Sequence, residues 1–276
     1  MIKKKAYVIG TNVDKSLSPL IFNHWFKKYK IDATYEYKVI KEKNFNKEVN
    51  LLLKEKGLCG FNVTIPFKEK ILKKMNKIDG PSKKIKAVNC VTVKKNKYYG
   101  SNTDWLGFKE ALLSEITKNE TKIKSKGKVV LIGYGGASKA ILYSLSSMGN
   151  RWKKNVLVFN RSKKRINIPL ISQKTTLPLT SLKSHLKEAF LVINTAPRNI
   201  LADLKIKKIN KETAVCDIVY KPKETSFFKH FKNPSLKVYG INMLVNQARP
   251  CFFNWFGIMP TNDAALIKKL IKETSK

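Results

Sequence analysis

The sequence predicts an α/β protein whose second half carries a doubly wound parallel sheet. Three observations lead to this fold class. Short apolar runs alternate with amphipathic segments over the first part of the chain. A strand, a glycine-rich turn, a helix and a second strand follow one another at residues 128–160. Two more apolar runs, at residues 190–193 and 214–219, suit buried parallel strands.

The first part of the chain alternates strands and helices. Strands are predicted at residues 6–10, 34–39, 58–64, 88–93 and 98–100. The last two are expected to pair as a hairpin around Lys95 and Asn96. Ser18 is expected to cap the first helix, with Pro19 in its first turn. Pro66 is expected to begin a short helix, and the other helices are predicted at residues 45–54, 105–116, 243–256 and 262–274.

The glycine-rich turn lies between a predicted strand at residues 128–132 and a helix that reaches Leu145. Gly133 would permit the tight turn, and Gly135 would let the backbone approach a pyrophosphate at the helix N-terminus. Ser138 stands where the usual pattern has a third glycine or alanine. The position of the turn between a strand and a helix favours a Rossmann-type dinucleotide site over a plain tight turn.

The end of the next predicted strand, residues 155–159, indicates which dinucleotide is bound. An NAD site usually has a carboxylate at this point for the ribose 2′-hydroxyl. Here Asn160 and Arg161 begin the basic run N-R-S-K-K-R at residues 160–165. A carboxylate would repel a 2′-phosphate, whereas a guanidinium pairs with it, so the sequence favours NADP.

Composition excludes several classes of protein. The chain has 276 residues, of which 43% are hydrophobic, so it can bury a core and is not expected to be disordered. It contains no apolar run near the ~20 residues that a bilayer-spanning helix needs. The four cysteines are scattered and the three histidines lack metal-ligand spacing. We therefore expect reduced thiols, a cytoplasmic location and no metal site.

The chain carries a formal net charge of +37, with 51 lysines but only five arginines. A charge of this size raises the alternative of a basic nucleic-acid-binding protein. However, the lysines are spread along almost the whole chain. Arginine, which reads guanine and phosphate through paired hydrogen bonds, is scarce. We interpret most of the lysines as a solvated surface and expect no specific nucleic-acid partner.

Four polar clusters in the first part carry residue types found in binding sites. They are S-L-S-P at 16–19, N-V-T-I-P-F-K at 62–68, A-V-N-C at 87–90 and S-N-T-D at 101–104. Asn62 and Thr64 lie two positions apart in a predicted strand, so both point to one face. Each cluster also has a purely structural interpretation, in which Ser18 and Asp104 cap helices and Asn89 forms a turn.

Taken together and in this order, the motifs resemble the shikimate dehydrogenase family. Besides the four polar clusters, the matching segments are G-Y-G-G-A at 133–137, N-R-S at 160–162, D-I-V-Y at 217–220 and G-I-N-M-L-V-N-Q at 240–247. They span nearly the whole chain. The N-V-T-I-P-F-K segment followed by N-T-D is highly specific, whereas the glycine loop is not.

The resemblance implies two domains and a reaction. Residues 1–104 would form an α/β substrate domain, to which the C-terminal helices of residues 240–276 return, and residues 105–239 would form a Rossmann NADP-binding domain. The reaction would be the reversible, NADPH-dependent reduction of 3-dehydroshikimate to shikimate, a step of chorismate and aromatic amino-acid biosynthesis. The sequence is compatible with a monomer or a homodimer.

The resemblance also assigns roles by motif position. Lys68 and Asp104 would be the catalytic pair, because an ammonium can donate the proton that a reduced ketone oxygen needs and a carboxylate can orient it. The residues implied to hold the substrate are Ser16, Ser18, Asn62, Thr64, Lys68, Asn89, Asp104, Tyr220 and Gln247. Those implied to bind NADP are Gly133, Tyr134, Gly135, Gly136, Ala137, Asn160, Arg161, Ser162, Lys163, Lys164, Arg165, Ile218, Gly240 and Met243.

The chain departs from the family pattern in the cofactor domain. Residues 161–189 are short for a crossover and include Pro169 and Pro178, so we expect the helix there to be truncated or irregular. Two alternatives stay open. One is an NAD-dependent quinate/shikimate dehydrogenase, against which Arg161 argues. The other is a basic nucleic-acid-binding protein on a Rossmann-like scaffold.

Overall fold

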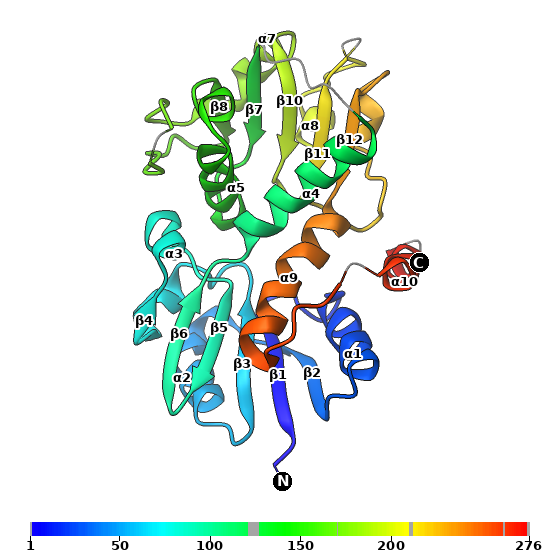
Figure 1. Cartoon of the computed structure of the whole chain (residues 1–276). Helices are drawn as coiled ribbons and strands as arrows, with labels where there is room; N and C mark the ends of the chain where they lie inside the picture. Colours follow the sequence, from blue (N-terminus) through cyan, green and yellow to red (C-terminus); the bar gives the residue numbers. More distant parts are fainter. Residues whose placement is uncertain (1, 121–126, 170, 210–211, 262, 275–276) are drawn as a thin grey trace. The chain divides into compact units, whose positions relative to one another are not determined.

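The computed structural model describes residues 2–120, 127–169, 171–209, 212–261 and 263–274. The chain forms two compact α/β units (Figure 1). The first unit is Met1–Thr103 with Gln247–Leu270, and the second is Asp104–Asn246 with Ile271–Lys276. Within the described ranges, no helix is both long enough and apolar enough to cross a bilayer.

The first unit is built on a mixed six-stranded sheet in the order β2-β1-β3-β5-β6-β4. The strands are β1 (Lys4–Gly10), β2 (Ala33–Val39), β3 (Leu58–Val63), β4 (Lys77–Ile78), β5 (Cys90–Lys94) and β6 (Lys97–Ser101). Strands β5 and β6 form the predicted hairpin. Lys95 and Asn96 both have positive φ, at 48° and 57°, as the tightest two-residue hairpin turn requires.

Helices cover both faces of this sheet. They are α1 (Ser18–Lys28), α2 (Phe45–Leu53), α3 (Gly80–Ile85), the later part of α9 (Gly240–Phe256) and two 3-10 helices, η1 (Glu42–Asn44) and η2 (Lys70–Lys74). Helix α2 packs on the face that carries Phe61 and Val63. Aromatic side chains of α1 and α9 pack around β2: Phe22 stacks on Tyr35 at 4.1 Å and on Trp255 at 5.3 Å between ring centroids.

The prediction that Ser18 caps α1 is wrong. The helix already includes Ser18, and Leu17 occupies the N-cap position. The reason is the hydroxyl of Ser16, which accepts a hydrogen bond from the Ser18 N–H at 3.2 Å and so satisfies one donor that the helix leaves open. Pro19 lies in the first turn, as expected.

The prediction that a helix begins at Pro66 is also wrong. The chain makes a turn there, in which the Phe67 N–H donates to the Thr64 carbonyl at 2.9 Å, and only η2 follows. The Lys68 carbonyl, which an α-helix would pair with Leu72, accepts the Val88 N–H at 2.8 Å. This bond ties the turn to the strand hairpin instead of to a helix.

The second unit is built on a parallel six-stranded sheet in the order β12-β11-β10-β7-β8-β9. The strands are β7 (Lys128–Ile132), β8 (Val156–Asn160), β9 (Leu177–Pro178), β10 (Ala189–Asn194), β11 (Ala214–Asp217) and β12 (Leu236–Tyr239). Counted along the chain from β7, this is the 3-2-1-4-5-6 order of the Rossmann fold, which confirms the predicted fold class. Strand β12 was not predicted.

Side chains of β7 alternate between two cores. Val129 and Leu131 pack in the core that α4 (Asp104–Lys118) and α5 (Gly136–Ser147) help to form. Val130 and Ile132 pack in the core that holds residues of α7 (Leu182–Leu186) and α8 (Ile200–Asp203). The remaining elements are α6 (Asn150–Lys153), η3 (Leu179–Ser181), η4 (Phe228–His230) and α10 (Ala264–Thr274). Residue 262, the predicted start of the last helix, lies outside the described residues.

The expected irregular crossover is confirmed. The described residues between β8 and β9 contain no helix. The space that a crossover helix would cover is filled by the side chains of Ile166, Ile168 and Ile171, which are buried in the core beside β7 and β8. Three isoleucines in an irregular segment thus replace the apolar face of a helix.

Helix α9 begins at Gly240, three positions before the predicted start.

Asp263 offers a test of how charge contributes to the stability of the first unit. Its Oδ2 accepts hydrogen bonds from His24 Nε2 at 3.0 Å and Lys28 Nζ at 2.9 Å, and its Oδ1 accepts the N–H groups of Ala265 and Leu266 at the start of α10. The hydrogen bonds from His24 and Lys28 lower the pKa of Asp263. Ionised Asp263 therefore stabilises the folded state fully above the unfolded pKa of about 3.9, and this contribution declines as the pH falls from there toward the lower pKa of the folded state.

Asp263→Asn is expected to lower the free energy of unfolding by about 1 kcal/mol at pH 7, because asparagine keeps the helix cap but loses the charge. The difference in melting temperature from wild type should shrink as the pH is lowered from 7 to 3, measured by thermal unfolding. Asp32→Asn is the control, since Asp32 is exposed and lies 3.6 Å from Lys3. A difference that stays constant with pH would show that the Asp263 charge is unimportant.

Candidate active site

Three polar side chains from distant segments meet in the first unit. The Asn89 Nδ2 group donates to Thr103 Oγ1 at 2.9 Å and to Gln247 Oε1 at 3.2 Å. The Asn89 Oδ1 atom accepts the Thr103 N–H at 2.7 Å. All three residues are buried, so these bonds fix the orientation of both amides. The Gln247 side chain, which comes from helix α9, is thereby tied to the residues that follow β6 and precede β5.

Asn62 is held by a second set of bonds beside this cluster. Its Nδ2 donates to the Asn89 carbonyl at 3.0 Å and to Cys251 Sγ at 3.1 Å, and its Oδ1 accepts the Tyr35 hydroxyl at 2.8 Å. Both amide hydrogens are therefore used within the first unit. This geometry gives Asn62 a structural part in shaping the site, in addition to the ligand contact that its motif position implies.

Ser16, Ser18 and Thr64 follow the ends of two neighbouring parallel strands. Ser16 and Ser18 come after β1, and Thr64 comes directly after β3, where its N–H donates to the Ile9 carbonyl at 3.0 Å. Gly10 makes room for Thr64: a Cβ on Gly10 would lie 2.6 Å from Thr64 Cγ2. All three residues thus lie in segments that follow the carboxyl ends of parallel strands, the edge at which α/β sheets bind ligands.

The two predicted catalytic residues are Lys68 and Asp104, and each is positioned by its own segment. Lys68 is half-buried in the turn after β3, and its backbone is held by the bond from Val88, the residue before Asn89. Asp104 is buried, at 5% exposure, as the first residue of α4. It follows Thr103 directly, so the cluster of Asn89, Thr103 and Gln247 fixes the residue before it.

The glycine-rich turn after β7 has the backbone geometry that a pyrophosphate site needs. Gly133 has φ of +99°, and a Cβ there would lie 2.5 Å from Thr195 Oγ1. At Gly135 an added Cβ would meet no described atom within 4 Å, which leaves room beside the N-terminus of α5. The first turn of α5, at Gly136 and Ala137, has N–H groups with no partner in the helix. This turn, which also includes Tyr134, therefore fits a phosphate group.

Ser138 has a role that its sequence position did not indicate. Its hydroxyl accepts the Gly135 N–H at 3.1 Å and lies 2.7 Å from Thr195 Oγ1. The Thr195 hydroxyl in turn donates to the Ile132 carbonyl at 2.7 Å. The serine that replaces the third glycine therefore fixes the turn to the end of β7.

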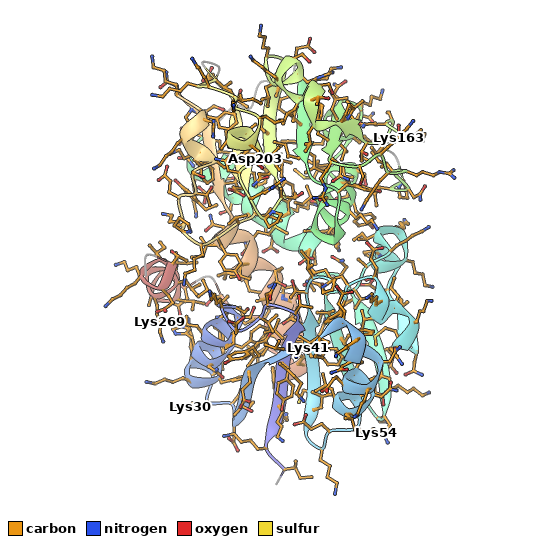
Figure 2. All side chains as sticks on the ribbon, turned by 180° about the vertical axis from the view of Figure 1, so that it is seen from behind. Lys30, Lys41, Lys54, Lys163, Asp203 and Lys269 are labelled. Carbon is orange, nitrogen blue, oxygen red and sulfur yellow. The ribbon has the colours of Figure 1, made fainter. Side chains whose placement is uncertain are left out.

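The basic run after β8 is exposed. Arg161, Lys163, Lys164 and Arg165 all lie on the surface of the second unit, and Figure 2 shows Lys163 at its periphery. Asn160 holds the start of the run, because its Nδ2 donates to the Ser162 carbonyl at 2.9 Å. The run has the position after the second Rossmann strand at which a 2′-phosphate is read.

The loop after β11 carries Ile218 and Tyr220 and is held by Asp217. The Asp217 carboxylate accepts hydrogen bonds from the Val219 N–H at 3.0 Å, Asn194 Nδ2 at 3.0 Å and the Thr225 hydroxyl at 2.5 Å. Burial raises the pKa of Asp217, and these bonds oppose the rise. Sequence reasoning gave Asp217 no role, although the D-I-V-Y motif contained it.

Gly240 allows helix α9 to begin against the same loop. A Cβ at Gly240 would lie 2.4 Å from the Ile218 carbonyl oxygen, so only glycine fits there. Met243 follows one turn later and is buried in the core beside Ile218. The structure therefore brings together Ile218, Gly240 and Met243, which the sequence had assigned to one end of the cofactor.

Comparison with known proteins identifies the family. A family model described as the shikimate dehydrogenase substrate binding domain matches residues 8–91. A protein of Caldicellulosiruptor bescii named shikimate dehydrogenase (NADP(+)) is 31% identical, over 99% of this chain and 96% of its own length. A protein of the same name from Bacillus cereus is 35% identical, over 93% of this chain and 94% of its own.

A solved structure agrees with these relatives. The crystal structure of shikimate dehydrogenase from Aquifex aeolicus matches with a TM-score of 0.80 at 28% identity, and the match covers 99% of this chain and 100% of that chain. The fold, the ordered motifs and relatives above 30% identity over nearly their whole length point the same way. This chain belongs to the shikimate dehydrogenase family.

Proposed function

We propose that this chain catalyses the reversible, NADPH-dependent reduction of 3-dehydroshikimate to shikimate. The observation that carries the proposal is the buried cluster of Asn89, Thr103 and Gln247. A buried cluster of oriented amides and hydroxyls suits a polyhydroxylated ring, because such groups favour a ligand that supplies matching hydrogen bonds. The shared name of the relatives, shikimate dehydrogenase (NADP(+)), supports the same reaction.

The two functions are assigned to different parts of the chain. Substrate binding belongs to residues 1–104 and 240–276, and NADP binding belongs to residues 105–239. The matched substrate-binding model, at residues 8–91, supports the first assignment. By motif position, we assign the binding of the substrate carboxylate and hydroxyls to Ser16, Ser18, Asn62, Thr64, Asn89, Tyr220 and Gln247.

Lys68 is assigned the proton transfer. Its ammonium donates a proton to the ketone oxygen during reduction, and its neutral amine accepts the proton during oxidation. By motif position, the Asp104 carboxylate is assigned to orient a substrate hydroxyl and the proton-transferring lysine. When bound, the nicotinamide cofactor supplies the hydride.

The second unit has residues that fit NADP. Residues 133–137 would hold the pyrophosphate against α5, and the run 160–165 would pair with the 2′-phosphate. Ile218, Gly240 and Met243 would border the nicotinamide, in a setting made apolar by the core around Met243.

A panel of two cofactors and two substrates tests the proposal. The purified protein is expected to reduce NADP⁺ with shikimate, and to do so at least tenfold more efficiently than with NAD⁺ or with quinate. Formation of the reduced cofactor, followed by absorbance, gives kcat/KM for each pair. Equal efficiency with NAD⁺ and quinate would favour the NAD-dependent alternative, and no turnover with any pair would overturn the enzyme assignment.

Two further assignments follow from the same proposal. We place the protein in the cytoplasm, a location supported by Cys59, Cys90, Cys216 and Cys251, which are all free thiols. We assign it a monomeric or homodimeric state and no specific nucleic-acid partner. Nucleic acid bound through charge alone would be released by salt and would show no sequence preference.

A further inference from the structure

The segment between β8 and β9 holds its basic run through one buried hydroxyl. Thr176, at 5% exposure, stands just before β9. Its Oγ1 accepts the Lys164 N–H at 2.9 Å and donates to the Ser162 carbonyl at 3.1 Å. Its own N–H donates to the Lys164 carbonyl at 2.9 Å. One residue therefore fixes backbone groups at two positions of the run 160–165.

The stretch of residues 173–176 that leads into β9, here called the return limb, is held against β8 by a side-chain amide. Gln173 Oε1 accepts the Val158 N–H at 2.8 Å, and its Nε2 donates to the Val158 carbonyl at 3.2 Å. Strand β9 itself pairs only with Phe159 and Asn160. Gln173 thus extends the pairing of β8 by one residue. The segment is held at Gln173, at Thr176 and by its buried isoleucines.

This arrangement bears on how the run can bind a phosphate. Long lysine and arginine side chains lose conformational entropy when they bind, and a backbone that is already fixed lowers the total cost. A threonine hydroxyl can donate and accept at the same time, which the two bonds to Ser162 and Lys164 require. Valine has nearly the same shape and can do neither.

We propose that Thr176 is a positioning residue that gives this chain its selectivity for NADP over NAD. It acts by holding Arg161 and its basic neighbours in the place where they meet the 2′-phosphate, and it does not itself contact the cofactor. The proposal rests on the proposed function, since it takes NADP to be the cofactor. It places the selectivity in the segment that replaces the crossover helix.

The experiment measures binding of two adenosine fragments without catalysis. Adenosine 2′,5′-bisphosphate carries the 2′-phosphate and adenosine 5′-monophosphate does not, and calorimetry gives a Kd for each. Thr176→Val is expected to weaken binding of the bisphosphate by about five- to tenfold in Kd, since it removes two hydrogen bonds that hold the run 160–165. The affinity for the monophosphate should stay within twofold of wild type. Thr176→Ser should restore the wild-type ratio.

Matched variants make the result specific. Thr175→Val is the same substitution at the exposed neighbouring residue and should leave both affinities unchanged. Gln173→Ala, which undocks the return limb by another route, should show the same selective loss as Thr176→Val and serves if that variant does not fold. Arg161→Ala removes a residue assigned to contact the 2′-phosphate directly. Its loss of affinity for the bisphosphate therefore shows how large a complete loss of that contact is.

The outcomes separate this inference from the proposed function. Equal weakening of both fragments in Thr176→Val, or no change in either, would overturn the positioning role. Loss of selectivity in Thr175→Val as well would also overturn it. If wild type binds the two fragments equally, the NADP assignment itself fails, whatever Thr176 does.

Discussion

Lys68→Ala is expected to lower kcat for shikimate oxidation by about 10²- to 10⁴-fold, the usual contribution of a general acid–base group. The physical reason is that the ketone oxygen gains a proton as carbon gains the hydride, and the variant has no ammonium or amine at that position. Binding of shikimate should change by less than about threefold, because the substrate is held mainly by amides and hydroxyls. Steady-state kinetics and calorimetry with shikimate measure the two quantities.

Lys70→Ala is the matched control for this prediction. Lys70 lies two residues further along the chain, is exposed, and pairs with Glu42 at 2.7 Å. Its removal should leave both kcat and shikimate affinity near wild type. Normal turnover in Lys68→Ala would remove Lys68 from the mechanism, and a similar loss in Lys70→Ala would attribute the effect to general loss of positive charge.

Gly60→Ala is expected to cause the largest loss of stability among glycine substitutions in the first unit. A Cβ at Gly60 would lie 2.2 Å from Trp255 Nε1 and 2.3 Å from the Val91 carbonyl oxygen. These two atoms form a buried hydrogen bond of 3.0 Å that joins α9 to β5. Overpacking and loss of this bond together should lower the free energy of unfolding by about 2–4 kcal/mol.

Thermal unfolding followed by tryptophan fluorescence checks the Gly60 prediction. Gly80→Ala is the control, because a Cβ there would meet no described atom within 4 Å. Its melting temperature should stay within a degree or two of wild type or rise slightly, as alanine favours a helix more than glycine does. Equal melting temperatures for the two variants would mean that α9 can move away from β5 at little cost.

Strands with continuous apolar runs were the most predictable elements of the fold. Strand β7 has the predicted bounds because residues 129–132, which follow Lys128, are apolar on both faces, as suits a central parallel strand. Strand β12, with the sequence L-K-V-Y, was missed because four residues with one lysine carry no clear period. Its strand form depends on pairing with β11. The turn after Pro66 was missed for the same reason, since its hydrogen bond to Val88 comes from another segment.

The candidate site was also predictable only where the signal is local to the sequence. Residues that lie in recognisable motifs, such as Asn89 and Gln247, could be proposed from the sequence through resemblance to a family. Their hydrogen bond joins positions 158 residues apart, so no local pattern reveals it. Thr176 lies in no motif, and its role depends on where the return limb docks. Sequence patterns therefore predict the residues of recognisable motifs better than the residues that hold those motifs in place.

The amide of Gln173 also has a consequence for solubility. Strand β8 pairs with β7 on one side, and short β9 covers only its last two residues on the other. An uncovered outer strand offers its N–H and C=O groups to any extended chain, and this is a common route to aggregation. By occupying both groups of Val158, Gln173 blocks that route at a point that short β9 does not reach. A shortened crossover in this chain is thus compatible with a protein that does not self-associate through β8.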